Sequence, residues 1–108
     1  MQMTCDETDA ALVVRLSGEI IMDAVTERRA EVERLALASA APAVVVDLSG
    51  VAFMDSSGVG FLIGLRRLCQ EHGKTLSVAN PAPPIKKLLA MLRLTEYFAV
   101  PQTGPSAA

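Results

Sequence analysis

The spacing of the apolar residues changes abruptly in the middle of the chain. A short run of β-branched residues, Val44–Val46, closes on Asp47 and is typical of a buried strand. After a short loop the apolar residues follow one another at helical spacing as far as Cys69. This pattern predicts a strand that runs into a helix spanning about residues 57–70.

The junction between this strand and this helix reads Asp55-Ser56-Ser57-Gly58. Residues of these types are preferred at a helix start, because their side-chain oxygens accept hydrogen bonds from unpaired backbone N–H groups. The same unpaired groups and the helix dipole also favour a phosphate. The two serines are therefore either caps or acceptors of a phosphate.

Three further segments have the composition and alternation of strands. Residues 11–17 are mostly apolar and are followed by Gly18, which predicts the end of a buried strand. Residues 1–7 form a weaker edge strand, which residues 8–10 turn into an antiparallel hairpin. The alternating segment 74–79 predicts the last strand.

Two more helices are predicted on either side of the central one. Asp23 is the expected N-cap of the first, and prolines before Ile85 fit the first turn of the last. The apolar faces of these helices are Val25, Val32, Leu35 and Ala36, and Ile85, Leu88, Leu89 and Leu92. In the central helix Gly60 and Gly64 share one face, which we expect to pack against the sheet.

The predicted elements combine into one α/β domain. Strands that alternate with helices favour a small mixed sheet of about four to five strands, with the later strands parallel and the helices packed against it. A length of 108 residues suits a single core. We expect the domain to span residues 1–101, with a flexible tail at 102–108.

Composition excludes several classes of function. No apolar stretch approaches the ~20 residues that a membrane-spanning helix needs, and the N-terminus has no secretory pattern, so we expect a cytoplasmic protein that does not bind membranes. Two cysteines without a Cys-x-x-Cys pair and one histidine offer too few ligands for a metal. The formal net charge of −2 argues against direct binding of nucleic acid.

Enzymatic interpretations lack the residues they need. Gly58, Gly60 and Gly64 do not match the dinucleotide fingerprint, and no phosphate-binding loop of the G-x-x-x-x-G-K-[ST] type exists in the chain. A nucleophilic Ser57 would need a base, but His72, the single histidine, belongs at the far end of the predicted helix. We expect a binding module without cofactor or metal rather than an enzyme.

The segment from Val44 to Gly64, Val-Val-Val-Asp-Leu-Ser-Gly-Val-Ala-Phe-Met-Asp-Ser-Ser-Gly-Val-Gly-Phe-Leu-Ile-Gly, closely resembles the signature of STAS domains, specifically of bacterial anti-sigma factor antagonists. Leu16–Glu19 resembles the family's earlier turn, and Leu76–Val78 with Leu88 and Leu92 resembles its last third. The resemblance implies a small mixed sheet with helices packed against it, which agrees with the fold predicted from periodicity.

The resemblance also implies a function. In that family the second serine of Asp-Ser-Ser-Gly is phosphorylated by a partner that is both a serine kinase and the anti-sigma factor, and here this residue is Ser57. Ser56 is the less favoured acceptor and is expected mainly to cap the helix. The unphosphorylated protein, a monomer or weak dimer, would bind the anti-sigma factor and release a sigma factor, and a phosphoserine phosphatase would reverse the modification. The expected partner-binding residues are Asp23, Asp55, Ser56, Ser57, Gly58, Val59 and Gly60.

Two points stay open at the level of sequence. The chain has Ile21 where the family usually has an aspartate, and Asp23 either substitutes for that aspartate or does not. The alternative function is that of a STAS domain which serves, without phosphorylation, as a structural subunit of a transport or signalling assembly.

The central helix carries more apolar residues than one face can bury. Val59, Phe61 and Ile63 cannot all face the sheet together with Leu62 and Leu65. We therefore expect some of them to border an exposed patch for the partner.

Overall fold

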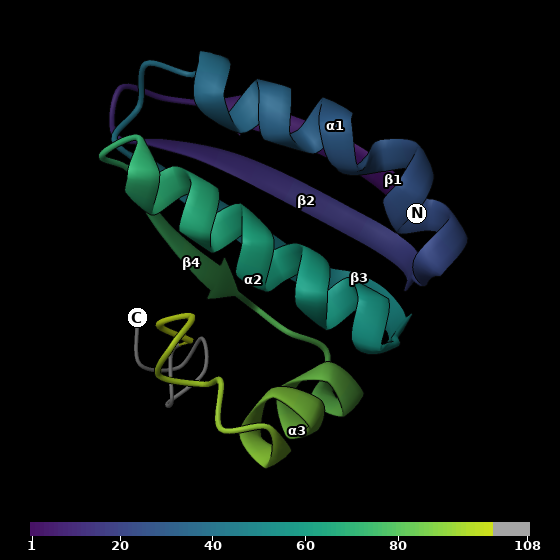
Figure 1. Ribbon diagram of the computed structural model, residues 1–108. Helices are drawn as coiled ribbons and strands as arrows, with labels where there is room; N and C mark the ends of the chain where they lie inside the picture. The colour runs from purple at the N-terminus through teal and green to yellow at the C-terminus, as the bar shows by residue number, and fades with distance from the viewer. Residues whose placement is uncertain (101–108) are drawn as a thin grey trace.

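The structure, a computed structural model, describes residues 1–100 as a four-stranded sheet with two long helices lying side by side across one face (Figure 1). The elements in chain order are β1 (Gln2–Glu7), β2 (Ala11–Ile20), α1 (Met22–Ala38), β3 (Ala43–Met54), α2 (Ser56–Glu71), β4 (Thr75–Ala79) and α3 (Pro83–Met91). The predicted domain boundary at residue 101 and the predicted tail, residues 102–108, lie outside the described residues.

The sheet is mixed and its strands lie in chain order, as the α/β prediction required. β1 and β2 form the predicted antiparallel hairpin, whereas β2, β3 and β4 are parallel and are connected through α1 and α2. The register places Val14 beside Val46 and Val46 beside Val78. These side chains point toward α1 and α2 and are fully buried, so the core lies between the helices and this face of the sheet.

β2 does not end at Gly18 as predicted. The strand continues to Ile20 because the pairing with β3 shifts register on either side of this glycine. Gly18 has a φ of +87°, a conformation that other residues rarely adopt, so it forms an irregularity within the strand and not its end. The extra residues carry the end of β2 to the end of β3.

The residues after α3 complete the sheet edge. Phe98 is fully buried, and its carbonyl oxygen accepts a hydrogen bond from the N–H of Val78 in β4 at 2.9 Å. Ile85 and Leu89 of α3 are buried as predicted, whereas Leu92 is 48% exposed. Leu92 lies at the C-cap, where the chain leaves the helix, and the helical spacing therefore no longer directs its side chain toward the core.

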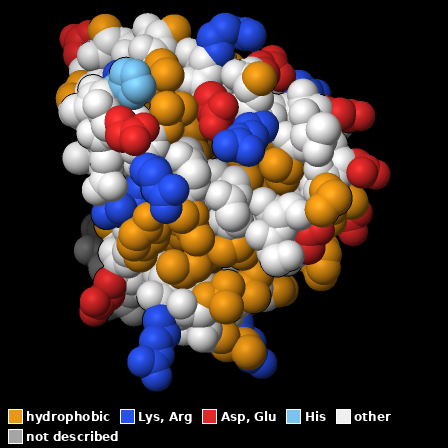
Figure 2. Space-filling view, viewed as in Figure 1, with side chains coloured by type: hydrophobic (Ala, Val, Ile, Leu, Met, Phe, Trp, Pro, Cys, Tyr) orange, Lys and Arg blue, Asp and Glu red, His pale blue; other side chains and the backbone are white. Residues whose placement is uncertain are grey.

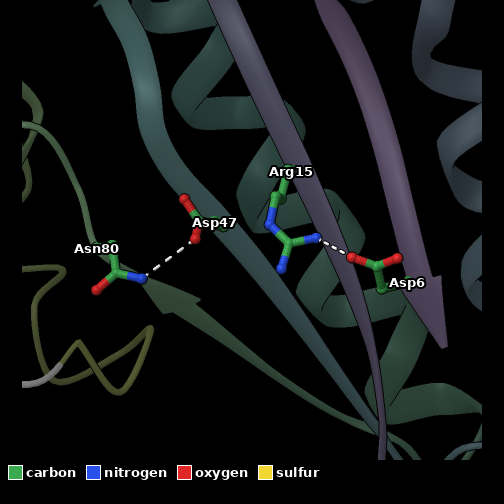
Figure 3. A network of polar contacts seen from close by, with 4 residues as sticks. All are labelled: Asp6, Arg15, Asp47 and Asn80. Atoms are coloured by element: carbon green, nitrogen blue, oxygen red, sulfur yellow. Dashed lines mark hydrogen bonds and ion pairs between the residues drawn. The ribbon is translucent and has the colours of Figure 1, made fainter. Parts of the chain in front are cut away.

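The sheet face away from α1 and α2 carries a polar network (Figure 3). Arg15 of β2 forms an ion pair with Asp6 of β1. Asp47 of β3 accepts hydrogen bonds from the Asn80 side-chain amide at 3.1 Å and from the Ser49 backbone N–H at 2.8 Å. One face of the sheet is thus a dry core and the other is polar.

Candidate functional site

The candidate site lies where β3 ends and α2 begins. Asp55 is the N-cap of α2, and its Oδ1 accepts a hydrogen bond from the backbone N–H of Gly58 at 3.0 Å. Ser56 and Ser57 are the first two residues inside the helix. The predicted capping role is therefore confirmed for Asp55 and wrong for Ser56, because the cap lies one residue earlier in the chain.

The same carboxylate also contacts the start of α1. Asp55 Oδ2 accepts a hydrogen bond from the backbone N–H of Met22 at 3.3 Å. The prediction that Asp23 is the N-cap of α1 is wrong, because Asp23 lies in the first turn of the helix. The N-cap is Ile21, whose side chain cannot accept a hydrogen bond. Asp55 therefore supplies side-chain oxygens to the first turns of two helices.

Parallel pairing of β2 and β3 explains why two helices begin at one place. Both strands end at the same edge of the sheet, and the N–H of Asp55 bonds the carbonyl oxygen of Ile20 at 3.3 Å. A helix follows each strand, so the positive ends of both helix dipoles meet here. This end of the molecule favours an anionic group.

Gly58 fixes how closely α2 approaches the end of β2. A Cβ at this position would lie 2.5 Å from the carbonyl oxygen of Ile20 and 2.5 Å from Met54 Cγ, so only glycine fits without a shift. Gly58 is buried and positions the helix, and its predicted contact with the partner stays a prediction.

The exposure of α2 also departs from the sequence prediction. Val59 and Phe61 are buried, so neither borders an exposed patch, whereas Ile63 is partly buried. Gly60 has no atom within 4 Å of a Cβ built on it, and the nearest atom for Gly64 is Nη2 of Arg29 in α1, at 4.0 Å. The expected packing of these glycines against the sheet is therefore wrong, because the helix turns this face to solvent and to α1.

The two serines differ in exposure. Ser56 is exposed and Ser57 is half-buried, and neither hydroxyl forms a hydrogen bond with another residue in the described part of the chain. No acidic residue lies in the first turn of α2, whereas Asp23 lies in that of α1. A hydroxyl is thus available beside two helix N-termini, with the Asp55 carboxylate close by.

Two exposed hydrophobic residues beside this site were missed in the sequence. Met22 is 63% exposed and Phe53 is 52% exposed. Met22 donates its backbone N–H to Asp55, and Phe53 precedes Asp55 by two residues. No local pattern identifies either residue: alternation along Ile20-Ile21-Met22 would expose Ile21, but the strand ends at Ile20 and Met22 begins α1. Exposed large apolar side chains beside a polar site are typical of a protein interface.

Other candidate chemistry lies away from this site. His72 is the C-cap residue of α2, at the opposite end of the helix from Ser57, and its Nδ1 lies 3.0 Å from the carbonyl oxygen of Leu68. Burial raises the pKa of the Cys69 thiol, and it also raises that of Cys5 with help from neighbouring carboxylates.

Among residues 1–100, no three His, Cys, Asp or Glu side chains come together as a metal site would require. No helix in the same range is long and apolar enough to span a membrane.

Comparison with known proteins relates nearly all of the described chain to one family. The family model described as "Mlab, STAS domain" matches residues 3–101. An anti-sigma F factor antagonist of Lysinibacillus sphaericus is 35% identical over 89 residues, covering 82% of this chain and 73% of that protein. Another, of Paenibacillus polymyxa, is 30% identical over 100 residues, covering 93% and 86%.

Solved structures of anti-sigma factor antagonists are also similar to this chain. The unphosphorylated anti-sigma factor antagonist SpoIIAA aligns with a TM-score of 0.76 at 25% identity, over 94% of this chain and 90% of that one. The phosphorylated form of SpoIIAA from Bacillus aligns with a TM-score of 0.70 at 25% identity, over 94% and 93%. A Thermotoga maritima protein aligns with a TM-score of 0.83, over 97% and 90%, but at 15% identity this shows the shared fold alone.

Proposed function

This chain belongs to the STAS domain family, and from that premise we propose that it is an anti-sigma factor antagonist switched by phosphorylation of Ser57. In the unphosphorylated form it binds an anti-sigma factor that is also a serine kinase, and the bound sigma factor is released. Phosphorylation ends this binding and a phosphoserine phosphatase restores it. Similarity to SpoIIAA, which has been solved in an unphosphorylated and a phosphorylated form, supports the proposal.

The observation that carries the proposal is the place of Ser57. Its hydroxyl has no partner among the described residues, and it lies in the first turn of α2, two residues after Asp55, whose carboxylate binds the backbone N–H of Met22. A kinase can reach such a hydroxyl, whereas a core hydroxyl would be inaccessible. Asp23, Ser56 and Gly60, near the starts of α1 and α2, are also exposed.

Charge explains how the modification would act. A phosphate adds a charge of about −1.5 to −2 at Ser57. The two helix ends stabilise this charge, so the domain stays folded. The Asp55 carboxylate repels it, however, and a partner docked on Met22 and Phe53 would have to remove water from both anions. The phosphorylated protein is therefore expected to be folded but unable to bind.

The acceptor is tested by incubating the protein with its cognate anti-sigma kinase and ATP, followed by mass spectrometry of the modified peptide. Wild type and the matched control Ser56→Ala should each take up one phosphate, and Ser57→Ala none. Ser57→Ala should still bind the kinase in calorimetry, whereas the phosphorylated wild type should not. Equal phosphorylation of Ser57→Ala and wild type would overturn the assignment.

The partner surface is tested separately. Met22→Ser and Phe53→Ser should each weaken binding of the anti-sigma factor by about tenfold or more, because exposed apolar anchors contribute most to such interfaces. Glu71→Ser, which alters an exposed residue at the far end of α2, is the control and should leave this affinity unchanged. Circular dichroism establishes that all three variants are folded.

A further inference from the structure

A second group of exposed apolar residues lies around the end of α3. Met91 is 71% exposed and Leu92 is 48% exposed, and with Met22 and Phe53 they are the large hydrophobic residues most open to solvent in the described chain. Partly buried Leu88, Leu94 and Tyr97 belong to the same stretch of the chain and pack against the core. We call Leu88, Met91, Leu92, Leu94 and Tyr97 the α3 patch. Figure 2 shows a continuous band of hydrophobic side chains over α3 and the segment that follows it.

Positive charge borders the α3 patch. Residues 82–108 contain three basic side chains and one acidic one, whereas residues 1–81 contain seven basic and eleven acidic ones. Lys86, Lys87 and Arg93 are exposed and form no ion pair within residues 1–100. Figure 2 shows Lys and Arg side chains projecting along the lower margin of the band.

On its other side the patch meets Arg66 of α2. The guanidinium carbon of Arg66 lies 4.0 Å from the centre of the Tyr97 ring. Arg66 also donates to the side chain of Gln70 at 3.1 Å, but no carboxylate neutralises it among the described residues. The apolar surface therefore lies between cations that have no internal counter-ion.

We propose that the α3 patch is a second docking surface, which binds an amphipathic, acidic segment of a partner protein. The apolar face of that segment covers Leu88, Met91 and Leu92, and its Asp or Glu residues face Lys86, Lys87 and Arg93. This arrangement removes apolar surface from water and pairs the cations. The surface lies on α3, whereas Ser57 is on α2, so it does not depend on the proposed switch.

Other occupants fit the charge or the shape less well. Two copies of the chain meeting through this patch would bring like charges together. Residues 101–108 of the chain itself contain no acidic side chain. An anionic membrane would need a wide apolar helix face, but α3 has only nine residues and buries Ile85 and Leu89 in the core.

The probe for this surface is a synthetic amphipathic helix of about 16 residues, with Leu at i, i+3, i+4 and i+7 spacing and Glu on both flanks. A matched peptide carries Lys in place of Glu. Titrated into the full-length 15N-labelled protein, the Glu peptide should shift amide signals of residues 85–97 and leave those of residues 53–60 unmoved. Ser57→Asp should bind this peptide like wild type, so that failure of the Ser57 switch and failure of this proposal are distinguishable.

Variants identify the residues that bind. Lys87→Glu and the double variant Met91→Ser/Leu92→Ser should each weaken the Glu peptide by about tenfold. Arg34→Glu makes the same charge change at an exposed cation on α1 and should have little effect. Equal weakening by Lys87→Glu and Arg34→Glu, or equal binding of the Lys peptide, would overturn the proposal. Shifts of amide signals spread over the whole protein would also overturn it. So would a protein that does not bind the peptide but sediments with phosphatidylserine vesicles, or one that self-associates through the patch in gel filtration.

Discussion

Asp55 occupies a position that two helices share. One oxygen of its carboxylate accepts from the N–H of Gly58 in α2 and the other from the N–H of Met22 in α1. Each bond satisfies a donor that a helix start leaves unpaired. Asp55, two residues before the proposed phosphorylation site, therefore also connects the starts of α1 and α2.

Replacement of Asp55 by Ala should lower the free energy of unfolding by more than the ~0.5–2 kcal/mol of a single cap, because two helix starts lose an acceptor. Asp23→Ala is the matched control: Asp23 lies in the first turn of α1 but makes no capping bond, and only its favourable charge at the dipole, about 0.3–1 kcal/mol, is lost. Urea denaturation measures both. A loss for Asp55→Ala no larger than that for Asp23→Ala would contradict the shared cap.

Gly58 and Gly60 offer a second matched pair two residues apart. Gly58→Ala should destabilise the fold by about 1–3 kcal/mol, because the new methyl group would lie 2.5 Å from Ile20 and Met54 and force a shift. Gly60→Ala should stabilise it by up to about 1 kcal/mol, since the position is open and alanine favours helix. Thermal melts of the two variants should move in opposite directions, and a stable Gly58→Ala would refute the close approach.

Among the elements, the parallel strands determine the electrostatics of the polar sheet face. Partial burial alone would raise the pKa of Asp47, but hydrogen bonds from Ser49 and Asn80 and the charge of Arg15 outweigh it, so the pKa is lowered. The carboxylate thus binds protons less readily in the folded protein than in the unfolded chain. Its stabilising contribution is fully present above the ordinary aspartate pKa and is lost as the pH falls through the lowered folded pKa.

Asp47→Asn should remove this contribution. The variant should be less stable than wild type at pH 7, and the difference between them should shrink as the pH falls below about 4. Urea denaturation at pH 7, 4 and 3 measures the difference. Asp9→Asn, an exposed carboxylate in the β1–β2 turn, is the control, and an identical pH dependence of both variants would contradict the role of Asp47.

On the scale of the whole molecule, the residues after α3 form part of the fold. Phe98 is fully buried, contacts Tyr97 edge to face with ring centres 5.0 Å apart, and bonds β4 through its carbonyl oxygen. The outer edge of β4 is thereby covered at Val78. The last strand and the chain beyond α3 should consequently unfold together.

Truncation tests this unit and the expected domain boundary. A chain that ends at residue 101 should unfold at the same temperature as the full chain. A chain that ends at Leu92 loses Phe98 and should lose at least the ~3–5 kcal/mol expected for removing a buried phenylalanine. Circular dichroism melts measure both, and a stable chain ending at Leu92 would show that the C-terminal segment is dispensable.

The sequence by itself determined the local elements and the class of the fold. Period-two and helical spacing identified the hairpin, the parallel strands and the three helices, since these patterns depend on which residues can face a core within one segment. Asp55 as a helix cap was predictable for the same reason, because the cap bonds an N–H three residues away. The resemblance of Val44 to Gly64 to a known signature added Ser57, which no local pattern distinguishes from a capping serine.

Only the tertiary structure decided what depends on contacts between distant segments. The bond from Asp55 to Met22, 33 residues earlier, exists because two parallel strands end at one edge, and it displaced Asp23 from the expected cap. Gly58 proved buried and Gly60 open because the approach of α2 to β2 fixes which helix face meets the core. Exposure of Met22, Phe53, Met91 and Leu92 followed in the same way: hydrophobicity says that a side chain favours burial, but the packed neighbours decide whether there is room.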